Sequence, residues 1–159
     1  MPDFADILAQ SGNQPAAAFR TLEDLARRTV GARLFTVSMH DPARGVMWRA
    51  HSSDPAAYPV TGEKPLGEDR WTAQVVGRGQ PFVANSVAEF ADVFSDHALI
   101  QSLGCESCLN LPIFIDGDFR GTLNLLEGPG HYTPDRVAAA QGLRLPAIAT
   151  FLLADRLRA

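Results

Sequence analysis

The sequence predicts an α+β fold in which helices from both ends of the chain cover one face of a central antiparallel sheet. Two pairs of strand-like segments are each joined by a tight turn, which fits antiparallel neighbours. Segments at both ends of the chain have the three- and four-residue apolar spacing of helices. The expected order is helix, two strands, helix, strand, helix, two strands and helix, an arrangement that packs helices against a sheet.

The first segment, residues 1–30, is predicted to be helical. Apolar residues recur at helical spacing, but Gly12, Asn13 and Pro15 interrupt the pattern. We therefore expect a short helix followed by a longer one that begins near Pro15, since proline is favoured at a helix start. Gly31 is a plausible end for this second helix.

A first hairpin and a mixed segment follow. Residues 34–39 and 46–51 are rich in β-branched and aromatic residues and flank turn chemistry at 41–45, so they are expected to pair. The proline- and glycine-rich stretch 54–67 is expected to be a loop. Beyond it we predict a short helix at 68–76, a short strand at 82–85 and helical turns over 86–103.

A second hairpin is expected to pair residues 109–115 with 119–126 around the turn Asp116-Gly117-Asp118. Side chains alternate between the two faces of a strand. The aliphatic set suits packing against the terminal helices, whereas the mixed set suits a cavity. The aliphatic set is Leu109, Leu111 and Ile113, and the mixed set is Cys108, Asn110 and Pro112.

The chain is expected to close with a helix over 133–159. Thr133 followed by Pro134 is a helix start signal, and Pro146 is expected to interrupt or bend the helix. The whole chain, 1–159, is thus predicted to be one domain, with a helical segment at 1–30, a core at 31–132 and the last helix at 133–159.

Composition excludes several classes of protein. Hydrophobic residues make up 46% of the 159 residues, as in globular proteins, and no uninterrupted apolar run approaches the length of a membrane span. The net charge of −4 and the absence of a basic run argue against nucleic acid as a partner. Acidic residues stand where a signal peptide would be basic, so we expect a cytoplasmic location and no membrane partner.

Several motifs together resemble the GAF domain family of small-molecule sensor modules, over roughly Pro15 to Leu157. The resemblance implies a GAF-like (PAS-like) sheet with terminal helices on one face and a ligand pocket on the other, often in a dimer formed through those helices. The motifs are Gly104 with Ser107, Leu111-Pro112-Ile113, Asp116-Gly117-Asp118, Gly121-x-Leu123-x-Leu125, Pro81-Phe82-Val83-Ala84-Asn85 and Tyr132-Thr133-Pro134-Asp135.

The resemblance implies a sensor or regulatory domain that binds a small molecule of unknown identity, with no cofactor specified. A ligand-free dimerisation module is one alternative. Asn124-Leu125-Leu126-Glu127 does not reproduce the N-K-x-x-x-F-x-x-x-D-E pattern of the family's cyclic-nucleotide-binding members. No cysteine matches a bilin attachment position, so neither of these ligands is supported.

Cys105 and Cys108 allow a second alternative, a thiol enzyme. One branch of the family reduces free methionine-R-sulfoxide through cysteines, and this chain resembles it in part. It lacks that branch's cysteine upstream of the pocket helix. No metal site is predicted, because a zinc site needs about four ligands and only the distant His51 and His97 could supplement the pair. Structural or pocket-lining thiols are the remaining interpretation.

The pocket is expected between the sheet and segments 68–76 and 86–103. Asn110 is its most informative candidate, because a mid-strand asparagine is disfavoured by propensity and needs a hydrogen-bonding partner when buried. That partner is a ligand, a water or a protein group. Trp71 either stacks on a ligand or fills the core, and Trp48 is expected to fill the core. The full candidate set is Trp71, Phe82, Phe94, His97, Leu103, Cys108, Asn110 and Glu127.

A homodimer is expected because the terminal segments carry more apolar residues than one sheet-facing stripe needs. These residues are Leu143, Leu145, Ile148, Phe151, Leu152 and Leu157, with Phe4, Ile7 and Leu8 at the other end.

Overall fold

A computed structural model describes residues 3–159 and places six antiparallel strands in one sheet of order β3-β2-β1-β6-β5-β4. Consecutive strands pair as hairpins at β1–β2 and β5–β6, and β6 returns to lie beside β1. The α+β prediction with a central antiparallel sheet is therefore confirmed. The strands are β1 (Leu34–Asp41), β2 (Val46–Ser52), β3 (Lys64–Pro65), β4 (Phe82–Ala84), β5 (Ser107–Ile115) and β6 (Asp118–Glu127).

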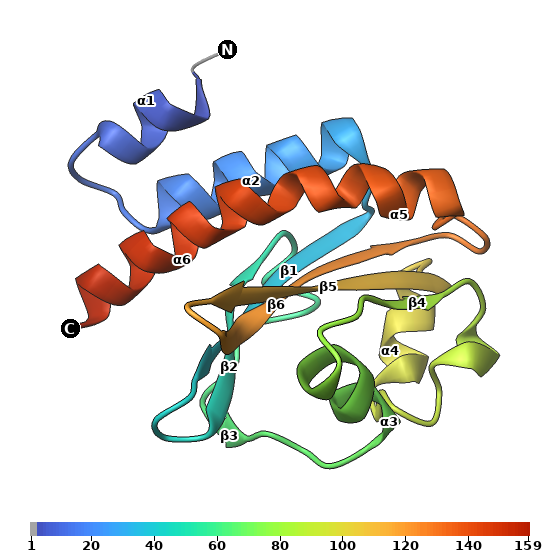
Figure 1. Ribbon diagram of the computed structural model, residues 1–159. Helices are drawn as coiled ribbons and strands as arrows, with labels where there is room; N and C mark the ends of the chain where they lie inside the picture. The colour runs from blue at the N-terminus through green and yellow to red at the C-terminus, as the bar shows by residue number, and fades with distance from the viewer. Residues whose placement is uncertain (1–2) are drawn as a thin grey trace.

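The helices form two groups on opposite faces of this sheet (Figure 1). The terminal group lies along one face and consists of α1 (Phe4–Ala9), α2 (Ala16–Thr29), α5 (Pro134–Ala140) and α6 (Arg144–Arg158). The other face carries α3 (Arg70–Thr72), a π-helical turn (Ala73–Gly77), a 3-10 turn (Val87–Glu89) and α4 (His97–Ser102).

Strand alternation divides the buried residues into two cores. Leu109, Leu111 and Ile113 of β5 pack with Phe19 of α2 and Phe151 of α6 in the helix-side core. The opposite core contains Cys108 of the same strand. The predicted register of this hairpin is thus confirmed, and buried residues of β1, β2, β5 and β6 occur in both cores.

The predicted tight turn and the glycine at the start of β6 both have a backbone reason. Asp116 and Gly117 adopt positive φ angles of 52° and 82°, as a two-residue hairpin turn requires, and Asp118 already belongs to β6. Gly121 has φ 140°, and a Cβ atom there would lie 2.0 Å from the Ser38 carbonyl oxygen. β1 and β6 can approach this closely only because residue 121 has no side chain.

The last helix is interrupted earlier than predicted. A 3-10 turn at Gln141–Leu143 separates α5 from α6, whereas Pro146 lies in the first turn of α6. The first-turn N–H groups of a helix have no intrahelical acceptor, so proline is tolerated there. Thr133 caps α5, and its hydroxyl oxygen accepts a hydrogen bond from the Arg136 N–H.

The segment 86–103 is less helical than predicted, because only Val87–Glu89 and His97–Ser102 form helical turns. The predicted loop 54–67 contains the short strand β3. Both segments pack over the sheet through aromatic and aliphatic side chains, including Tyr58, Phe90 and Ile100, rather than through a continuous helical stripe.

One helical stretch, Pro134–Arg158, is long and apolar enough to cross a membrane by length and composition alone. One side of this stretch packs in the helix-side core through Ala140, Leu143, Ala147, Phe151 and Ala154. That is the packing of a helix that covers a sheet.

Candidate functional site

A cavity of about 490 Å³ opens on the face of the sheet opposite the terminal helices. Its floor is formed by β1, β6 and β5, and β2 and β3 form one side. The other side is formed by α3 and the segment before α4. Apolar side chains, among them Met47, Leu66, Val93, Phe94 and Ile100, share the lining with polar ones. The size and mixed lining are typical of small-molecule sites.

A row of polar side chains crosses the floor of the cavity over three adjacent strands. Asn110 Nδ2 on β5 donates to Asn124 Oδ1 on β6 at 2.9 Å. Asn124 Nδ2 donates in turn to Thr36 Oγ1 and Ser38 Oγ on β1, each at 3.1 Å. The Thr122 hydroxyl donates to Asn124 Oδ1 at 2.8 Å. These five residues all line the cavity, so its floor is a hydrogen-bonded polar surface.

Trp71 joins this row from the α3 wall. Its Nε1–H donates to Asn110 Oδ1 at 2.8 Å, and the half-buried residue lines the cavity. The partner that a buried Asn110 needs is thus a pair of protein groups, Trp71 and Asn124. Trp48 packs in the helix-side core, where the Arg158 guanidinium lies 3.9 Å from the centroid of its ring, and it also borders the cavity.

The side formed by β2 carries an arginine that forms no ion pair within residues 3–159. The Arg49 guanidinium lies over the Tyr58 ring at 3.8 Å, and Nη1 donates to the Pro59 carbonyl oxygen at 2.7 Å. Its Nε–H is buried and has no acceptor among the described residues. Arg49 is therefore a cation that borders the cavity without an ion-pair partner among residues 3–159.

Two carboxylates in the cavity lining already accept hydrogen bonds. Asp96 accepts from the Tyr58 hydroxyl at 2.5 Å, and Asp69 accepts from the Thr72 N–H at 2.8 Å as the cap of α3. Burial and the hydrogen bond to Asp96 raise the pKa of Tyr58 above its ordinary range, so the phenol stays protonated. The Tyr58–Asp96 bond connects the 54–63 loop to the start of α4.

Three of the predicted site residues, Trp71, Phe94 and Asn110, lie together in the cavity lining. Three others, Phe82, Leu103 and Cys108, face the same side of the sheet but pack in the core beside the cavity. His97 also lies outside the lining, and its Nδ1 donates to the Phe94 carbonyl oxygen at 2.8 Å.

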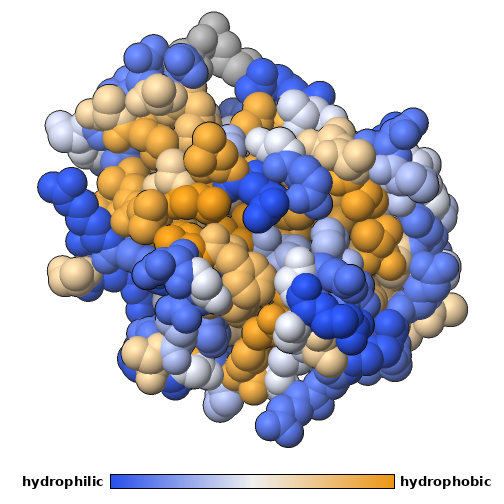
Figure 2. Space-filling view, viewed as in Figure 1, coloured by the Kyte–Doolittle hydropathy of each residue, from blue (hydrophilic) through white to orange (hydrophobic). Residues whose placement is uncertain are grey.

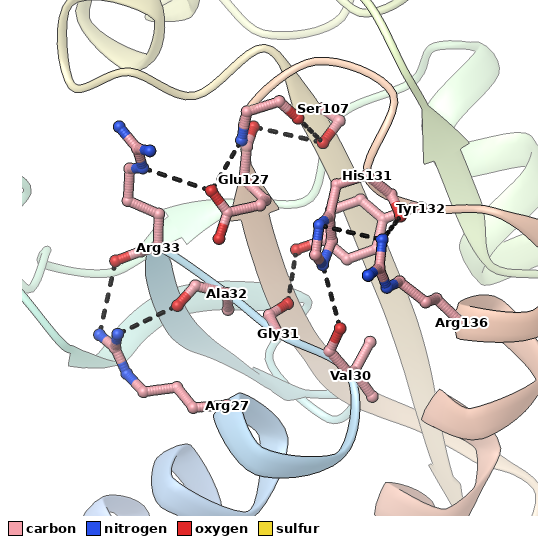
Figure 3. A network of polar contacts seen from close by, with 11 residues as sticks. Arg27, Val30, Gly31, Ala32, Arg33, Ser107, Glu127, His131, Tyr132 and Arg136 are labelled. Carbon is pink, nitrogen blue, oxygen red and sulfur yellow. Dashed lines mark hydrogen bonds and ion pairs between the residues drawn. The ribbon is translucent and has the colours of Figure 1, made fainter.

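Glu127 was expected to line the pocket but does not; it is the last residue of β6, next to the lining residue Leu126, and its carboxylate belongs to a separate polar network (Figure 3). Its carboxylate accepts hydrogen bonds from Arg33 Nε at 3.3 Å and from the Gly128 N–H at 2.9 Å. In the same network the Ser107 hydroxyl donates to the Gly128 carbonyl oxygen at 2.6 Å, and the Tyr132 hydroxyl donates to the Gly31 carbonyl oxygen at 3.1 Å. Glu127 therefore helps to fix strand ends.

Both cysteines are free, fully buried and absent from the cavity lining. Burial raises the pKa of the Cys105 thiol to about 11 and that of the Cys108 thiol to about 12. Both thiols are protonated at neutral pH, whereas a nucleophilic or redox-active cysteine needs an accessible thiolate. Within residues 3–159, no three histidine, cysteine or acidic side chains lie close enough to hold a metal ion.

The sequence interpretation missed most of the polar lining. Thr36, Ser38, Thr122 and Asn124 occur as two polar pairs at two-residue spacing in otherwise apolar strands. That spacing places each pair on one face of its strand, and it was the available signal. Arg49, Tyr58 and Asp96 carried no comparable local signal.

Solved structures share this fold at low sequence identity. The GAF domain of a two-component sensor histidine kinase from Bacillus halodurans is 14% identical, with a TM-score of 0.71 over 92% of this chain and 99% of that one. The second GAF domain of DevS from Mycobacterium smegmatis is 18% identical, with a TM-score of 0.63 over 91% and 99%. The substrate complex of free methionine-R-sulfoxide reductase from Neisseria meningitidis is also 18% identical, with a TM-score of 0.63 over 99% and 95%.

No curated protein matches the sequence significantly. The sequence model of the GAF domain family, in contrast, matches residues 13–143, most of the chain. This segment contains the whole sheet and every residue that lines the cavity. The chain belongs to the GAF domain family.

Proposed function

We propose that this chain is a sensor or regulatory domain that binds a small molecule. The cavity of about 490 Å³ carries this proposal, because it is large enough for a metabolite and combines a hydrogen-bonding floor with apolar walls. Trp71 supplies an aromatic surface at one wall, and Asn110 and Asn124 supply polar groups on the floor.

Two observations weigh against the alternatives. A ligand-free dimerisation module would be expected to fill this space with side chains, and the space is open. A thiol-dependent reductase of free methionine-R-sulfoxide would need a reactive cysteine at the cavity, and neither Cys105 nor Cys108 lines it. Turnover of that substrate, abolished by Cys108→Ser or Cys105→Ser, would overturn the sensor proposal.

The test is a thermal-shift screen of a small-metabolite library against the wild-type chain, with native mass spectrometry of the purified protein for a retained molecule. Compounds that raise the melting temperature should lose most of that effect in Trp71→Ala. They should keep it in Val137→Ala, a truncation at a residue that packs against the helix-side core and lies outside the cavity lining. A library without one stabilising compound, and a purified protein without a retained molecule, would contradict the proposal.

We further propose that the signal passes through a homodimer formed by the terminal helices. Within one chain, Leu143 and Phe151 are buried in the core. Leu145, Leu152 and Leu157 of α6 stay 74%, 50% and 51% exposed, so they are free to form an interface. Apolar side chains gather on the visible surface near α1 and α6 in Figure 2. Light scattering should give twice the mass of one chain, and Leu145→Glu with Leu152→Glu should give the monomer. A monomer at micromolar concentration in the wild type would refute this.

We also propose that the chain is located in the cytoplasm, as expected from its sequence. Cell fractionation of the source organism, with detection of the chain by antibody, would test it. Recovery in the membrane fraction would contradict it.

A further inference from the structure

The direction of every hydrogen bond in the floor of the cavity is set by Trp71. An indole N–H can only donate, so the atom of Asn110 that faces it must be Oδ1. The amide nitrogen of Asn110 must then face Asn124, which presents its own Oδ1. Both amide orientations follow from this one donor.

This polarity ends at β1 with two hydroxyl groups that act as acceptors. The two side-chain N–H groups of Asn124 donate to Thr36 Oγ1 and Ser38 Oγ. Each hydroxyl therefore keeps its own hydrogen, and neither donates a hydrogen bond to another group within residues 3–159. The edge of the floor nearest β2 thus offers two O–H donors from one strand.

The unpaired arginine lies on the neighbouring strand. Arg49 of β2 pairs in register with Ser38 of β1, and both line the cavity. Within residues 3–159 no carboxylate forms an ion pair with its guanidinium, whose Nη1 donates to the Pro59 carbonyl oxygen. The cation and the two hydroxyl donors all line the cavity, and its two carboxylates already accept hydrogen bonds, Asp96 from the Tyr58 hydroxyl and Asp69 from the Thr72 N–H.

We propose that Arg49, Ser38 and Thr36 form an anion subsite that binds the carboxylate of a small organic acid, whose apolar body lies against Trp71 and Phe94. The inference rests on the proposed small-molecule-binding function and specifies its ligand class. A carboxylate has two acceptor oxygens and no donor, which matches a donor-only subsite with one guanidinium. A neutral amide of the same shape would place an N–H₂ group against these donors.

The test uses matched acid and amide probes at about pH 7, where the acids are ionised. Acetate, phenylacetate and N-acetylglycine are each compared with the corresponding primary amide, by titration followed in nitrogen–proton correlation spectra. At least one acid should shift the Arg49 Nε–H and Trp71 indole signals and bind at least about tenfold more tightly than its amide.

Arg49→Gln should reduce the affinity for that acid by about tenfold or more, and Ser38→Ala should reduce it by a smaller factor. Arg44→Gln is the matched control, since it removes the same charge from the turn of the same hairpin but lies outside the cavity lining. Its affinity should equal that of the wild type. Melting temperatures of all three variants establish that they are folded at the temperature of the titration.

The outcomes separate this inference from the proposed function. Amides that bind as tightly as acids, or an Arg49→Gln variant that binds the acid like the wild type, would overturn the anion subsite and leave a small-molecule site in place. Sulfate or phosphate that binds in preference to every carboxylate would overturn the carboxylate assignment. Failure of all six probes to shift cavity signals at millimolar concentration would overturn the inference, and the library screen would then decide the proposed function separately.

Discussion

The two faces of the sheet are built from alternate residues of the same strands, yet their chemistry differs. On β5, Leu109 and Leu111 are buried among the aliphatic side chains of the terminal helices, while Asn110 between them faces the cavity. On β6 the same holds for Leu123 and Leu125 on either side of Asn124. The contrast therefore repeats from strand to strand.

The difference separates stability from recognition within a single layer. The helix-side face is closed by packing and contains side chains that fill space. The cavity face keeps open volume, and its polar side chains are held in place by hydrogen bonds to one another instead of by close packing. Changes on the first face should alter folding, whereas changes on the second should alter both folding and binding.

The largest expected effect is on the helix-side face. Phe151→Ala removes a fully buried ring from α6 and should lower the free energy of unfolding by about 3–5 kcal/mol. Arg156→Ala on the exposed side of α6 is the control and should change this free energy by less than about 0.5 kcal/mol. Urea denaturation of the purified variants measures both. Equal losses at the two positions would mean that α6 is not seated on the sheet through Phe151.

A smaller effect is expected in the polar floor. Asn110→Leu leaves the Trp71 Nε1–H without its acceptor and should cost about 1–3 kcal/mol. In the double variant with Trp71→Phe both partners are apolar, so part of that loss should be recovered. A double-mutant cycle by chemical denaturation measures this coupling. Strictly additive losses would show that the indole and the amide do not stabilise each other.

Sequence reasoning predicted the faces of the strands better than the extent of the cavity. The alternation through Cys108, Asn110 and Pro112 predicted which side each residue would face, because side-chain direction is a local property of a strand. Whether a residue on that side lines the cavity depends on which other segments of the chain pack over it. Both residues pair with β4, yet Cys108 is fully buried in the core beside the cavity, whereas Asn110, two residues away, borders the cavity.

The segments that cover this face of the sheet could not be predicted from local sequence patterns. Loop 54–67 and segment 86–103 contribute Tyr58 and Asp96, which meet across the chain through one hydrogen bond. Neither residue belongs to a periodic element, so spacing carries no information about their meeting. His97 and Leu103 were predicted from the same segment but lie outside the lining, which this segment reaches through Val93, Phe94, Ser95, Asp96 and Ile100.

The pH dependence of stability should reflect the buried thiols beside the cavity. The pKa of Cys108 is about 12 in the folded chain and about 9 when exposed, so the unfolded state loses its proton first as the pH rises. The stabilisation from the protonated thiol is complete below about pH 9 and is lost toward pH 12, by up to about 1.4 kcal/mol per pH unit for this residue. Cys108→Ala should flatten the alkaline decline measured by denaturation at several pH values. An unchanged decline would show that the thiol is not shielded from solvent.

The smallest expected effect returns to the helix side, at the edge of its core. The Arg158 guanidinium lies 3.9 Å from the centroid of the Trp48 ring, and Arg158 also pairs with Glu63 at 3.3 Å. Arg158 is exposed, so the contact with the ring should contribute only about 0.5–1 kcal/mol and the ion pair less. Arg158→Ala should therefore lower the free energy of unfolding by no more than about 1 kcal/mol.

Arg156→Ala is the control, because it removes the same charge two residues earlier, where no ion pair is formed with residues 3–159. It should leave the free energy of unfolding unchanged within about 0.5 kcal/mol. A loss that disappears at high salt would assign the effect to the Glu63 pair, because screening weakens exposed ion pairs. A loss that persists would assign it to the ring, and the helix-side face would then extend to Trp48 through the last turn of α6.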